Sequence, residues 1–263
     1  MVDLWQGGVR LHCREYGGSG RPVLLLHGLA GHSGEWRRTA EALAGEYRVL
    51  ALDLRGHGQS TRRPADVSRA AYVADVATVI RELGGGPVAL VGQSFGAHTA
   101  MLTAAAHPDL VDRLVLVEGG VGGAGGASVE AVEGWLRSWP APFATRADAE
   151  RFFGGPPSAG AWVDGLEERA DGLWPRFDVD ILVDALRPVA AAEHWPDWER
   201  LTCPTLLVLG ERGIIGAAEI AEMIARRPET RQVTIPAAGH DLHLERPDEW
   251  ARVLARYLGT GTA

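Results

Sequence analysis

The chain has 263 residues, of which 46% are hydrophobic and 23% charged, and its formal net charge is −8. A chain of this length can bury one large core. No apolar run reaches the roughly 18–20 residues that span a bilayer, and the acidic balance disfavours nucleic acid or an anionic membrane as partner. Residues 1–6 lack the basic and apolar segments of a signal peptide. We therefore expect a cytoplasmic protein with a small-molecule partner, and the composition leaves a homodimer open.

All 26 basic residues are arginine, because the chain has no lysine. This composition excludes Schiff-base chemistry and a P-loop, both of which need lysine. The two cysteines, Cys13 and Cys203, are too few and too far apart in the sequence for a disulfide framework or a metal cluster. We expect both thiols to be reduced and buried, and we expect neither a metal nor a cofactor.

Short apolar runs alternate with helical patterns along most of the chain. The runs predicted to be strands are 9–16, 22–26, 48–52, 88–91, 114–117, 205–209 and 232–235. The predicted helices are 36–44, 70–83, 94–106, 220–227 and 247–258. Strands that are apolar throughout are typical of a parallel sheet covered on both faces. The alternation therefore predicts an α/β fold, with a mostly parallel sheet and helices on both faces.

Residues 119–200 interrupt this alternation. The segment holds six of the nine tryptophans, and prolines break its helical patterns. We predict a helical lid at 119–200 on a core domain formed by 1–118 and 201–263. Large aromatics are most often packing residues, so about half of these tryptophans are expected only to hold the segment together. The run 120–125 matches G-x-G-x-x-G, but the residues after it lack the pattern of a dinucleotide site, which favours a hinge at the base of the lid.

The most informative motif is Gly-Gln-Ser-Phe-Gly at 92–96, directly behind the apolar run 88–91. It fits G-x-S-x-G between a strand and a helix, where a sharp turn holds the serine out at the carboxyl edge of a sheet. The small residues Gly92 and Gly96 let the backbone pass close to its neighbours. Ser94 is therefore the candidate nucleophile, and it needs a base beside it because a serine hydroxyl is weakly nucleophilic.

The base is expected to be a histidine far along the chain. His240 comes after the last predicted strand, in a loop from which its side chain can point across the sheet edge, and His243 is the alternative. His98 and His107 belong to the helix after Ser94 and to its end, and we expect them to point the wrong way for general-base work.

Acyl transfer also needs N–H donors for the oxyanion. One donor is predicted at Phe95, directly after the serine. The other is predicted at Leu29, in the His-Gly-Leu loop after the strand 22–26. The His-Gly pair indicates an oxyanion loop here because it ends a buried strand upstream of the serine motif.

Four motifs occur in order: His-Gly-Leu at 27–29, Asp-Leu-Arg-Gly-His-Gly-Gln-Ser at 53–60, the serine motif at 92–96, and Gly-His at 239–240. With them the chain resembles the α/β-hydrolase superfamily over nearly its whole length. The resemblance implies a helical lid after the sixth strand of the family. It also implies that the 53–60 loop shapes the floor of the pocket and has no direct part in the chemistry.

One position departs from the family pattern. Members usually carry the acid of the triad as Asp after the seventh strand, where this chain has Gly213, and Glu211 is two residues off. Haloalkane dehalogenases and a fungal zearalenone lactonase have their acid after the sixth strand instead, and Glu118 stands there in this chain. Because a lone buried carboxylate is costly, Glu118 is predicted to pair with His240. The alternative is a solvated glutamate and an incomplete triad.

These observations predict a serine hydrolase that cleaves a carboxylic ester or lactone through Ser94, His240 and Glu118. The tryptophan-rich segment favours a hydrophobic, aromatic or polycyclic substrate, with Trp135 and Trp139 on one helix face toward the pocket. A carbon–carbon bond hydrolase, a thioesterase or a cofactor-free perhydrolase can use the same residues. A ligand-binding protein on this scaffold also stays open, since the usual acid position is a glycine.

Overall fold

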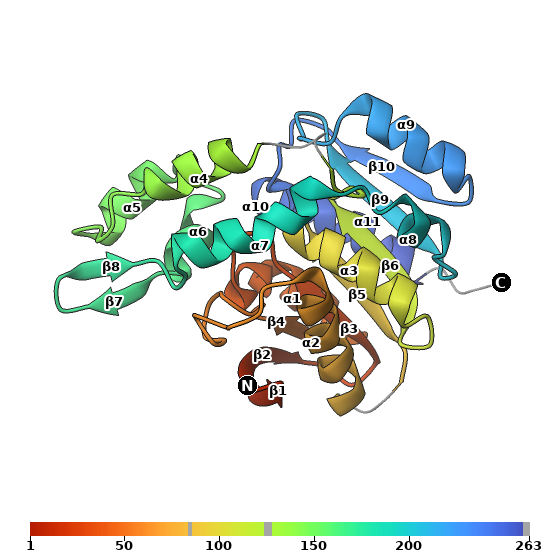
Figure 1. Ribbon diagram of the computed structural model, residues 1–263, viewed down its shortest axis with the longest axis horizontal. Helices are drawn as coiled ribbons and strands as arrows, with labels where there is room; N and C mark the ends of the chain where they lie inside the picture. The colour runs from red at the N-terminus through yellow and green to blue at the C-terminus, as the bar shows by residue number, and fades with distance from the viewer. Residues whose placement is uncertain (84–85, 124–127, 260–263) are drawn as a thin grey trace.

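The computed structural model describes residues 1–83, 86–123 and 128–259. Within these ranges an eight-stranded sheet has the order β1-β2-β4-β3-β5-β6-β9-β10 (Figure 1). Its strands are β1 (Val2–Gln6), β2 (Val9–Gly17), β3 (Arg21–Leu26), β4 (Tyr47–Leu52), β5 (Val88–Gln93), β6 (Val111–Val117), β9 (Thr205–Gly210) and β10 (Arg231–Ile235). Every neighbouring pair from β4 to β10 is parallel, whereas β2 pairs antiparallel with β1 and β4. The predicted α/β fold with a mostly parallel sheet is confirmed.

Different helices cover the two faces of the sheet. The helices of the core are η1 (Ser33–Trp36), α1 (Arg37–Leu43), α2 (Arg69–Glu82), α3 (Phe95–Ala106), α9 (Ala217–Arg226), α10 (Leu242–Glu245) and α11 (Pro247–Gly259). Leu24 and Leu26 of β3 belong to an apolar cluster with α2 and α3, and Val23 and Leu25 belong to another with α1 and α11. Because alternate side chains of a strand point to opposite faces and both faces are buried, the central strands are apolar along most of their length.

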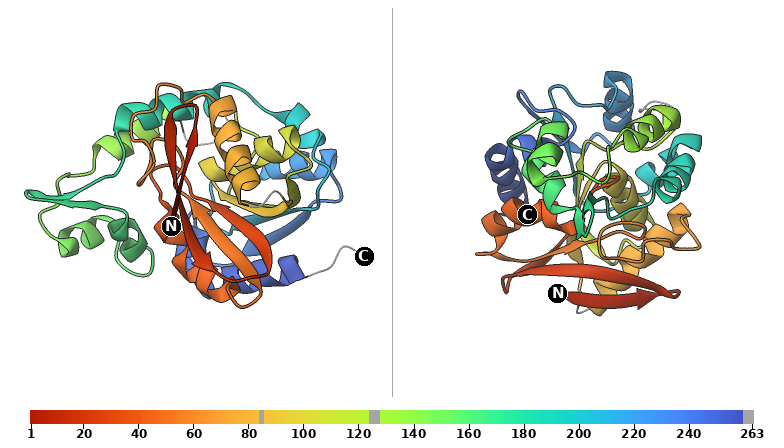
Figure 2. Two further views of the ribbon diagram at one scale, coloured as in Figure 1. Left: turned by 90° about the horizontal axis from the view of Figure 1, so that it is seen from below. Right: turned by 90° about the vertical axis from the view of Figure 1, so that its left-hand side faces the viewer.

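Strand β1 is not among the predicted elements. It pairs with β2 through Gly7 and Gly8, whose φ angles are 56° and 81°. The hairpin lies at one edge of the molecule (Figure 2). Two consecutive positive φ angles are typical of the tight turns that join antiparallel strands, and glycine adopts them without strain. The Gly-Gly pair between two alternating runs is thus the sequence signal for this hairpin.

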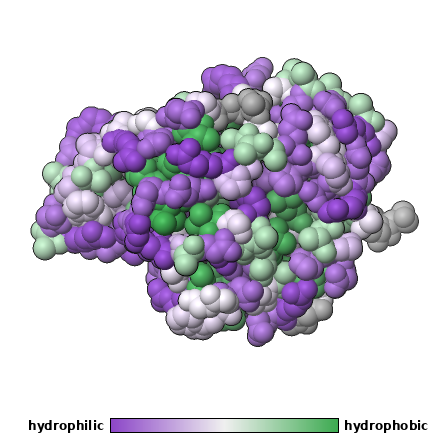
Figure 3. Space-filling model, in the orientation of Figure 1, coloured by the Kyte–Doolittle hydropathy of each residue, from purple (hydrophilic) through white to green (hydrophobic). Residues whose placement is uncertain are grey.

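Residues 119–200 join β6 to β9. In their described part they form α4 (Val129–Arg137), α5 (Arg146–Phe152), α6 (Ala159–Asp164), α7 (Val179–Ala191) and α8 (Trp195–Glu199), with an unpredicted hairpin of β7 (Glu167–Arg169) and β8 (Gly172–Trp174). Helices α4 to α6 and this hairpin extend beyond the sheet (Figure 1). The segment has its own apolar cluster, which includes Leu136, Trp139, Phe143 and Phe177. Hydrophobic side chains also gather where it meets the rest of the molecule (Figure 3). A lid function for this segment stays a prediction.

Helices α7 and α8 both pack against the main core of the molecule, and Ala185 of α7 belongs to its apolar cluster. Trp198 of α8 is fully buried in the main core cluster, and the indole N–H donates to the Met223 carbonyl at 2.9 Å. Part of the 119–200 segment therefore packs into the core, and the division at 201 stays a prediction. The predicted hinge at 120–125 lies partly outside the described residues. In its described part, the Gly123 N–H donates to the Val189 carbonyl of α7 at 2.8 Å.

No helix in the described ranges is long and apolar enough to cross a membrane. Cys13 and Cys203 are both free and buried. Burial raises the pKa of Cys13 to about 12, so this thiol stays protonated and unreactive at neutral pH. Two unpaired, buried thiols are what the sequence predicts.

Candidate active site

Ser94 lies in the tight turn between β5 and α3. Its φ of 51° and ψ of −115° form a conformation that is rare for a residue with a side chain and that concentrates at functional turns. The Ser94 N–H donates to the Val117 carbonyl at 2.8 Å, which ties the turn to β6. A Cβ at Gly92 would overlap the Gly96 backbone, and a Cβ at Gly96 would overlap the His27 carbonyl. The glycines of the motif are therefore required by the close approach of the backbone.

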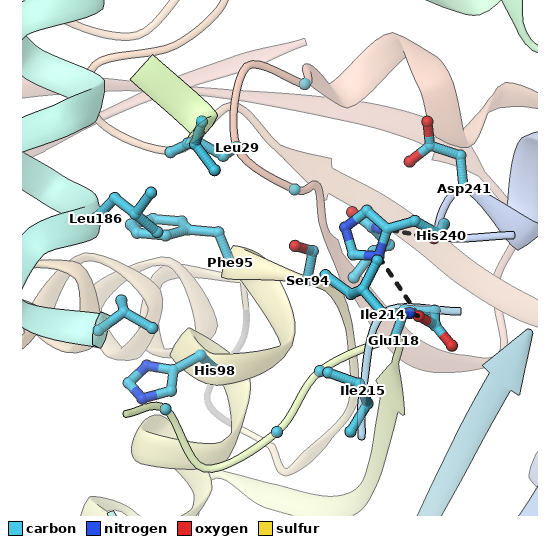
Figure 4. Close-up of a pocket in the computed structure, with 18 of the residues that line it drawn as sticks. Leu29, Ser94, Phe95, His98, Glu118, Leu186, Ile214, Ile215, His240 and Asp241 are labelled. Atoms are coloured by element: carbon cyan, nitrogen blue, oxygen red, sulfur yellow. Dashed lines mark hydrogen bonds and ion pairs between the residues drawn. The ribbon is translucent and has the colours of Figure 1, made fainter. Parts of the chain in front are cut away.

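Glu118 and His240 meet beside this turn although 122 positions separate them. Glu118 comes directly after β6, and His240 lies in the loop after β10. Glu118 Oε2 is 3.5 Å from His240 Nδ1, at the outer limit of a hydrogen bond, and catalytic hydrogen bonds often tighten only when substrate binds. The His240 ring lies between Ser94 and the Glu118 carboxylate (Figure 4). Gln93 Nε2 donates to the His240 carbonyl at 3.0 Å and so ties the histidine loop to the serine turn.

The Glu118 carboxylate is buried and well supplied with donors. Its side chain is 1% exposed. The Gly210 N–H donates to Oε1 at 2.7 Å, and the Ile214 N–H donates to Oε2 at 2.8 Å. These bonds offset the cost of burying the carboxylate and hold it toward His240. Glu118 is thus not a solvated glutamate, and its contact with the histidine is the predicted one.

Gly213, at the usual position of the acid, has a structural reason to be glycine. A Cβ at this position would overlap the Glu118 carboxylate. Glu118 therefore fills the space into which a side chain at 213 would extend. Glu211 points elsewhere, as predicted, because its Oε2 accepts the Ala237 N–H at 2.8 Å on the exposed side of the turn.

Ser94 and His240 line a cavity of about 360 Å³. The two predicted oxyanion donors, Leu29 and Phe95, also line it (Figure 4). Phe95 is the first residue of α3, and the first N–H groups of a helix have no acceptor within the helix. Much of the remaining wall is apolar and comes from α4, α6, α7 and the loop after β9, including Val132, Trp135, Trp162, Leu186, Val189 and Ile214. The cavity thus lies between the core and the 119–200 segment.

Of the two tryptophans predicted to face the pocket, only Trp135 lines this cavity. Trp139 is 7% exposed and packs among aromatic side chains, with ring centroids 4.8 Å from Phe153 and 5.1 Å from Phe177. The reason is that α4 ends at Arg137, so the two tryptophans do not share one helix face. Trp162 lies in the cavity wall where Trp139 was predicted. Because Trp162 is not part of a periodic pattern of aromatic residues, the sequence did not indicate that it lines the cavity.

The other histidines have different surroundings. His243, the alternative base, is buried, with Nε2 3.2 Å from Glu35 Oε1 and its ring stacked on Trp36 at 4.4 Å. It therefore has a structural partner of its own. His98 lines the cavity, but its ring lies away from Ser94 (Figure 4). Burial lowers the pKa of His98 well below its ordinary value, so the ring is neutral at neutral pH.

Sequence comparison bears on the family. Residues 21–247 match the model of the alpha/beta hydrolase fold. The chain belongs to this family. A 2-(acetamidomethylene)succinate hydrolase of Mesorhizobium japonicum is 27% identical over 98% of this chain and 94% of its own. An N-formylmaleamate deformylase of Pseudomonas putida is 30% identical over 89% of this chain and 87% of its own.

Structural comparison agrees. The crystal structure of an E-2-(acetamidomethylene)succinate hydrolase superposes with a TM-score of 0.86 at 26% identity, and the match covers 97% of each chain. The relatives found by the two comparisons include hydrolases of several kinds, among them a deformylase and an esterase. They support a hydrolase for this chain, and they do not assign its substrate.

Proposed function

We propose that this protein is a serine hydrolase that cleaves a carboxylic ester or lactone of a hydrophobic small molecule. The observation that carries the proposal is the convergence of three elements on one cavity. The strained turn after β5 presents Ser94, the loop after β10 presents His240, and the end of β6 presents Glu118 to the far side of the histidine. A nucleophile, a base and a group that orients the base are the parts that acyl transfer by serine requires.

In the proposed reaction, Ser94 Oγ attacks the carbonyl carbon while His240 Nε2 takes the hydroxyl proton. Glu118 accepts the hydrogen bond from His240 Nδ1, which selects the reactive tautomer and stabilises the imidazolium. The N–H groups of Phe95 and Leu29 stabilise the oxyanion. When the carbon–oxygen bond breaks, the alcohol leaves with the proton from His240. Water then attacks the acyl-enzyme and gives a proton to His240. The bond between the acyl carbon and Ser94 Oγ breaks, the proton passes from His240 to Ser94 Oγ, and the acid is released.

The cavity supports a small hydrophobic substrate. Its volume of about 360 Å³ is near the lower end of the range for small-molecule sites. Trp135 and Trp162 contribute large apolar surfaces, and their rings meet edge to face at 5.9 Å. This wall favours an acyl or alcohol group with apolar or aromatic character.

The test is a kinetic one with p-nitrophenyl esters of increasing acyl length. We expect a burst of p-nitrophenol equivalent to the enzyme concentration, because an acyl-enzyme accumulates when deacylation is slow. Ser94→Ala should abolish the burst and lower kcat by about 10⁴-fold or more. Ser138→Ala, a serine of the α4 C-cap outside the cavity, is the control and should keep both. Turnover that survives Ser94→Ala would exclude the proposed nucleophile.

A further inference from the structure

The cavity beside Ser94 has an acidic rather than a basic lining. Four carboxylates line it, and no arginine does so among the described residues, although the chain has 26 basic residues. The carboxylates are Glu35, Glu118, Glu219 and Asp241. A cavity for a carboxylate substrate would be expected to offer a cation, because arginine matches a carboxylate with two parallel hydrogen bonds.

Two of these carboxylates are occupied by the protein itself. Glu118 accepts two backbone N–H groups and faces His240. Glu35 lies 3.2 Å from His243 Nε2 and accepts the His32 N–H at 3.3 Å. Neither of these side chains is available to select a substrate.

Each of the other two carboxylates, Asp241 and Glu219, accepts a hydrogen bond at only one of its two oxygens. Asp241 Oδ2 accepts the Trp162 indole N–H at 3.3 Å, and Glu219 Oε1 accepts the Val121 N–H at 3.0 Å. In the part of the chain that the structure describes, neither carboxylate forms an ion pair with an arginine, and no group donates to Asp241 Oδ1 or Glu219 Oε2. Burial raises the pKa of both side chains. The protein thus places two incompletely compensated acids in a largely apolar cavity.

Aromatic rings stand next to one of these acids. The indole N–H of Trp162 donates to Asp241. The centroids of the Trp135 and Trp162 rings are 5.9 Å apart. Both rings line the cavity. Tryptophan faces attract cations, and a set of aromatic rings with a carboxylate is suited to a quaternary or protonated amine. The rings and the acid therefore favour the same kind of ligand group, independently of each other.

We infer that the cavity selects hydrophobic esters that bear a cationic ammonium group, held by Asp241, Trp162 and Trp135, and rejects esters that bear a carboxylate. This inference rests on the proposed function, since it names the substrate class of that site. It sets the chain apart from the hydrolase of Mesorhizobium japonicum and the deformylase of Pseudomonas putida, which are named for a succinate and a maleamate, both of them carboxylates.

The experiment compares three p-nitrophenyl esters whose acyl chains have equal length and end in trimethylammonium, tert-butyl or carboxylate. The first two groups have nearly the same shape, so their ratio of kcat/KM reports charge alone. The wild-type protein should prefer trimethylammonium over tert-butyl by about tenfold, and should disfavour carboxylate against tert-butyl by a similar factor. Hydrolysis without enzyme is subtracted for each ester.

Two variants test the residues. Asp241→Asn keeps an acceptor for the Trp162 N–H, and it should reduce the preference for trimethylammonium to about twofold or less. Trp162→Leu removes the ring face and should reduce it as well. Asp184→Asn, which changes an exposed aspartate on α7 outside the cavity, should leave the three-ester ratios at the wild-type values. Comparing ratios between variants cancels the intrinsic reactivity of each ester.

The outcomes separate the inference from the proposed function. Hydrolysis that depends on Ser94 but shows no preference for trimethylammonium, or shows a preference for carboxylate, would overturn the inference and leave the serine hydrolase intact. A charge preference that persists in both Asp241→Asn and Trp162→Leu would overturn the assignment of these residues. Absence of Ser94-dependent hydrolysis for all three esters would remove the proposed function and the inference with it.

Discussion

The Glu118 carboxylate occupies the space that a side chain at Gly213 would need. The two residues come after β6 and β9, which are neighbouring parallel strands whose carboxyl ends meet at the same edge of the sheet. A carboxylate at either position can therefore approach His240, but the two positions exclude each other. In this chain the acid stands at 118, and glycine at 213 is the matching residue.

An aspartate at position 213, where the family usually carries its acid, should accordingly lower the activity. We expect Gly213→Asp to lower kcat by about 10²-fold or more, because its side chain displaces the Glu118 carboxylate from His240. In the background of Glu118→Ala, the same Gly213→Asp change should recover at least part of the lost activity, since the space is then free. Steady-state kinetics of both single variants and the double variant measure this coupling. If the Gly213→Asp single variant were more active than the wild type, Glu118 would not be the acid of the triad.

The acid role of Glu118 is tested by its amide. Glu118→Gln should lower kcat by about 10³–10⁴-fold, because an amide cannot stabilise the imidazolium. It also places an NH₂ group against one of the two backbone N–H donors, which should cost about 1–3 kcal/mol of stability. Glu211→Gln is the matched control and should change neither quantity appreciably. Loss of stability without loss of kcat would mean that Glu118 is only structural.

Asp241 gives a prediction about pH. Burial raises its pKa above the ordinary value of 3.8, so between these two pKa values the folded state binds more protons than the unfolded state. The contribution of Asp241 to stability therefore becomes unfavourable as pH rises through this interval. Asp241→Asn should raise Tm near neutral pH, and the gain should disappear as the pH falls below about 4. Thermal unfolding of both proteins across this range is the measurement, and an equal Tm difference at every pH would contradict the explanation.

Substitution of Trp139 should mainly affect stability, whereas substitution of Trp135 should mainly affect substrate binding. Trp139→Ala removes a buried ring from the cluster of the 119–200 segment and should cost about 3–5 kcal/mol in denaturant unfolding. Trp135 is 41% exposed and lines the cavity, so Trp135→Ala should cost much less stability while raising KM for large substrates more than for small ones. The reverse pattern would show that the two tryptophans have been assigned the wrong way round.

The sequence predicts the core of this fold because its central strands are buried on both faces. The runs 22–26 of β3 and 88–91 of β5 have no polar positions that interrupt the pattern, and the serine motif marks the end of β5. The hairpin β7–β8 has only three residues in each strand and carries no comparable run. Its pairing depends on contacts within the segment, such as that between Phe143 and Leu173, which local sequence does not reveal.

Some residues of the site are likewise predictable from local sequence, whereas others are not. Ser94 and His240 are found from motifs that adjoin strand ends, and Glu118 is found from the resemblance to relatives that carry their acid after the sixth strand. Trp162, in contrast, reaches the cavity through the path of the whole 119–200 segment. Gln93 is part of the serine motif, yet its bond to the His240 loop becomes visible only when two distant loops are brought together.

The most direct test of the proposed triad is labelling of the wild-type protein with a fluorophosphonate probe, and then peptide mapping. Such probes react with a serine that a neighbouring base has activated. We expect rapid, stoichiometric modification of Ser94, slowed at least about tenfold in Glu118→Gln and unchanged in Glu211→Gln. Absence of label on Ser94 in the wild-type protein, or equal labelling rates in wild type and Glu118→Gln, would contradict the triad of Ser94, His240 and Glu118.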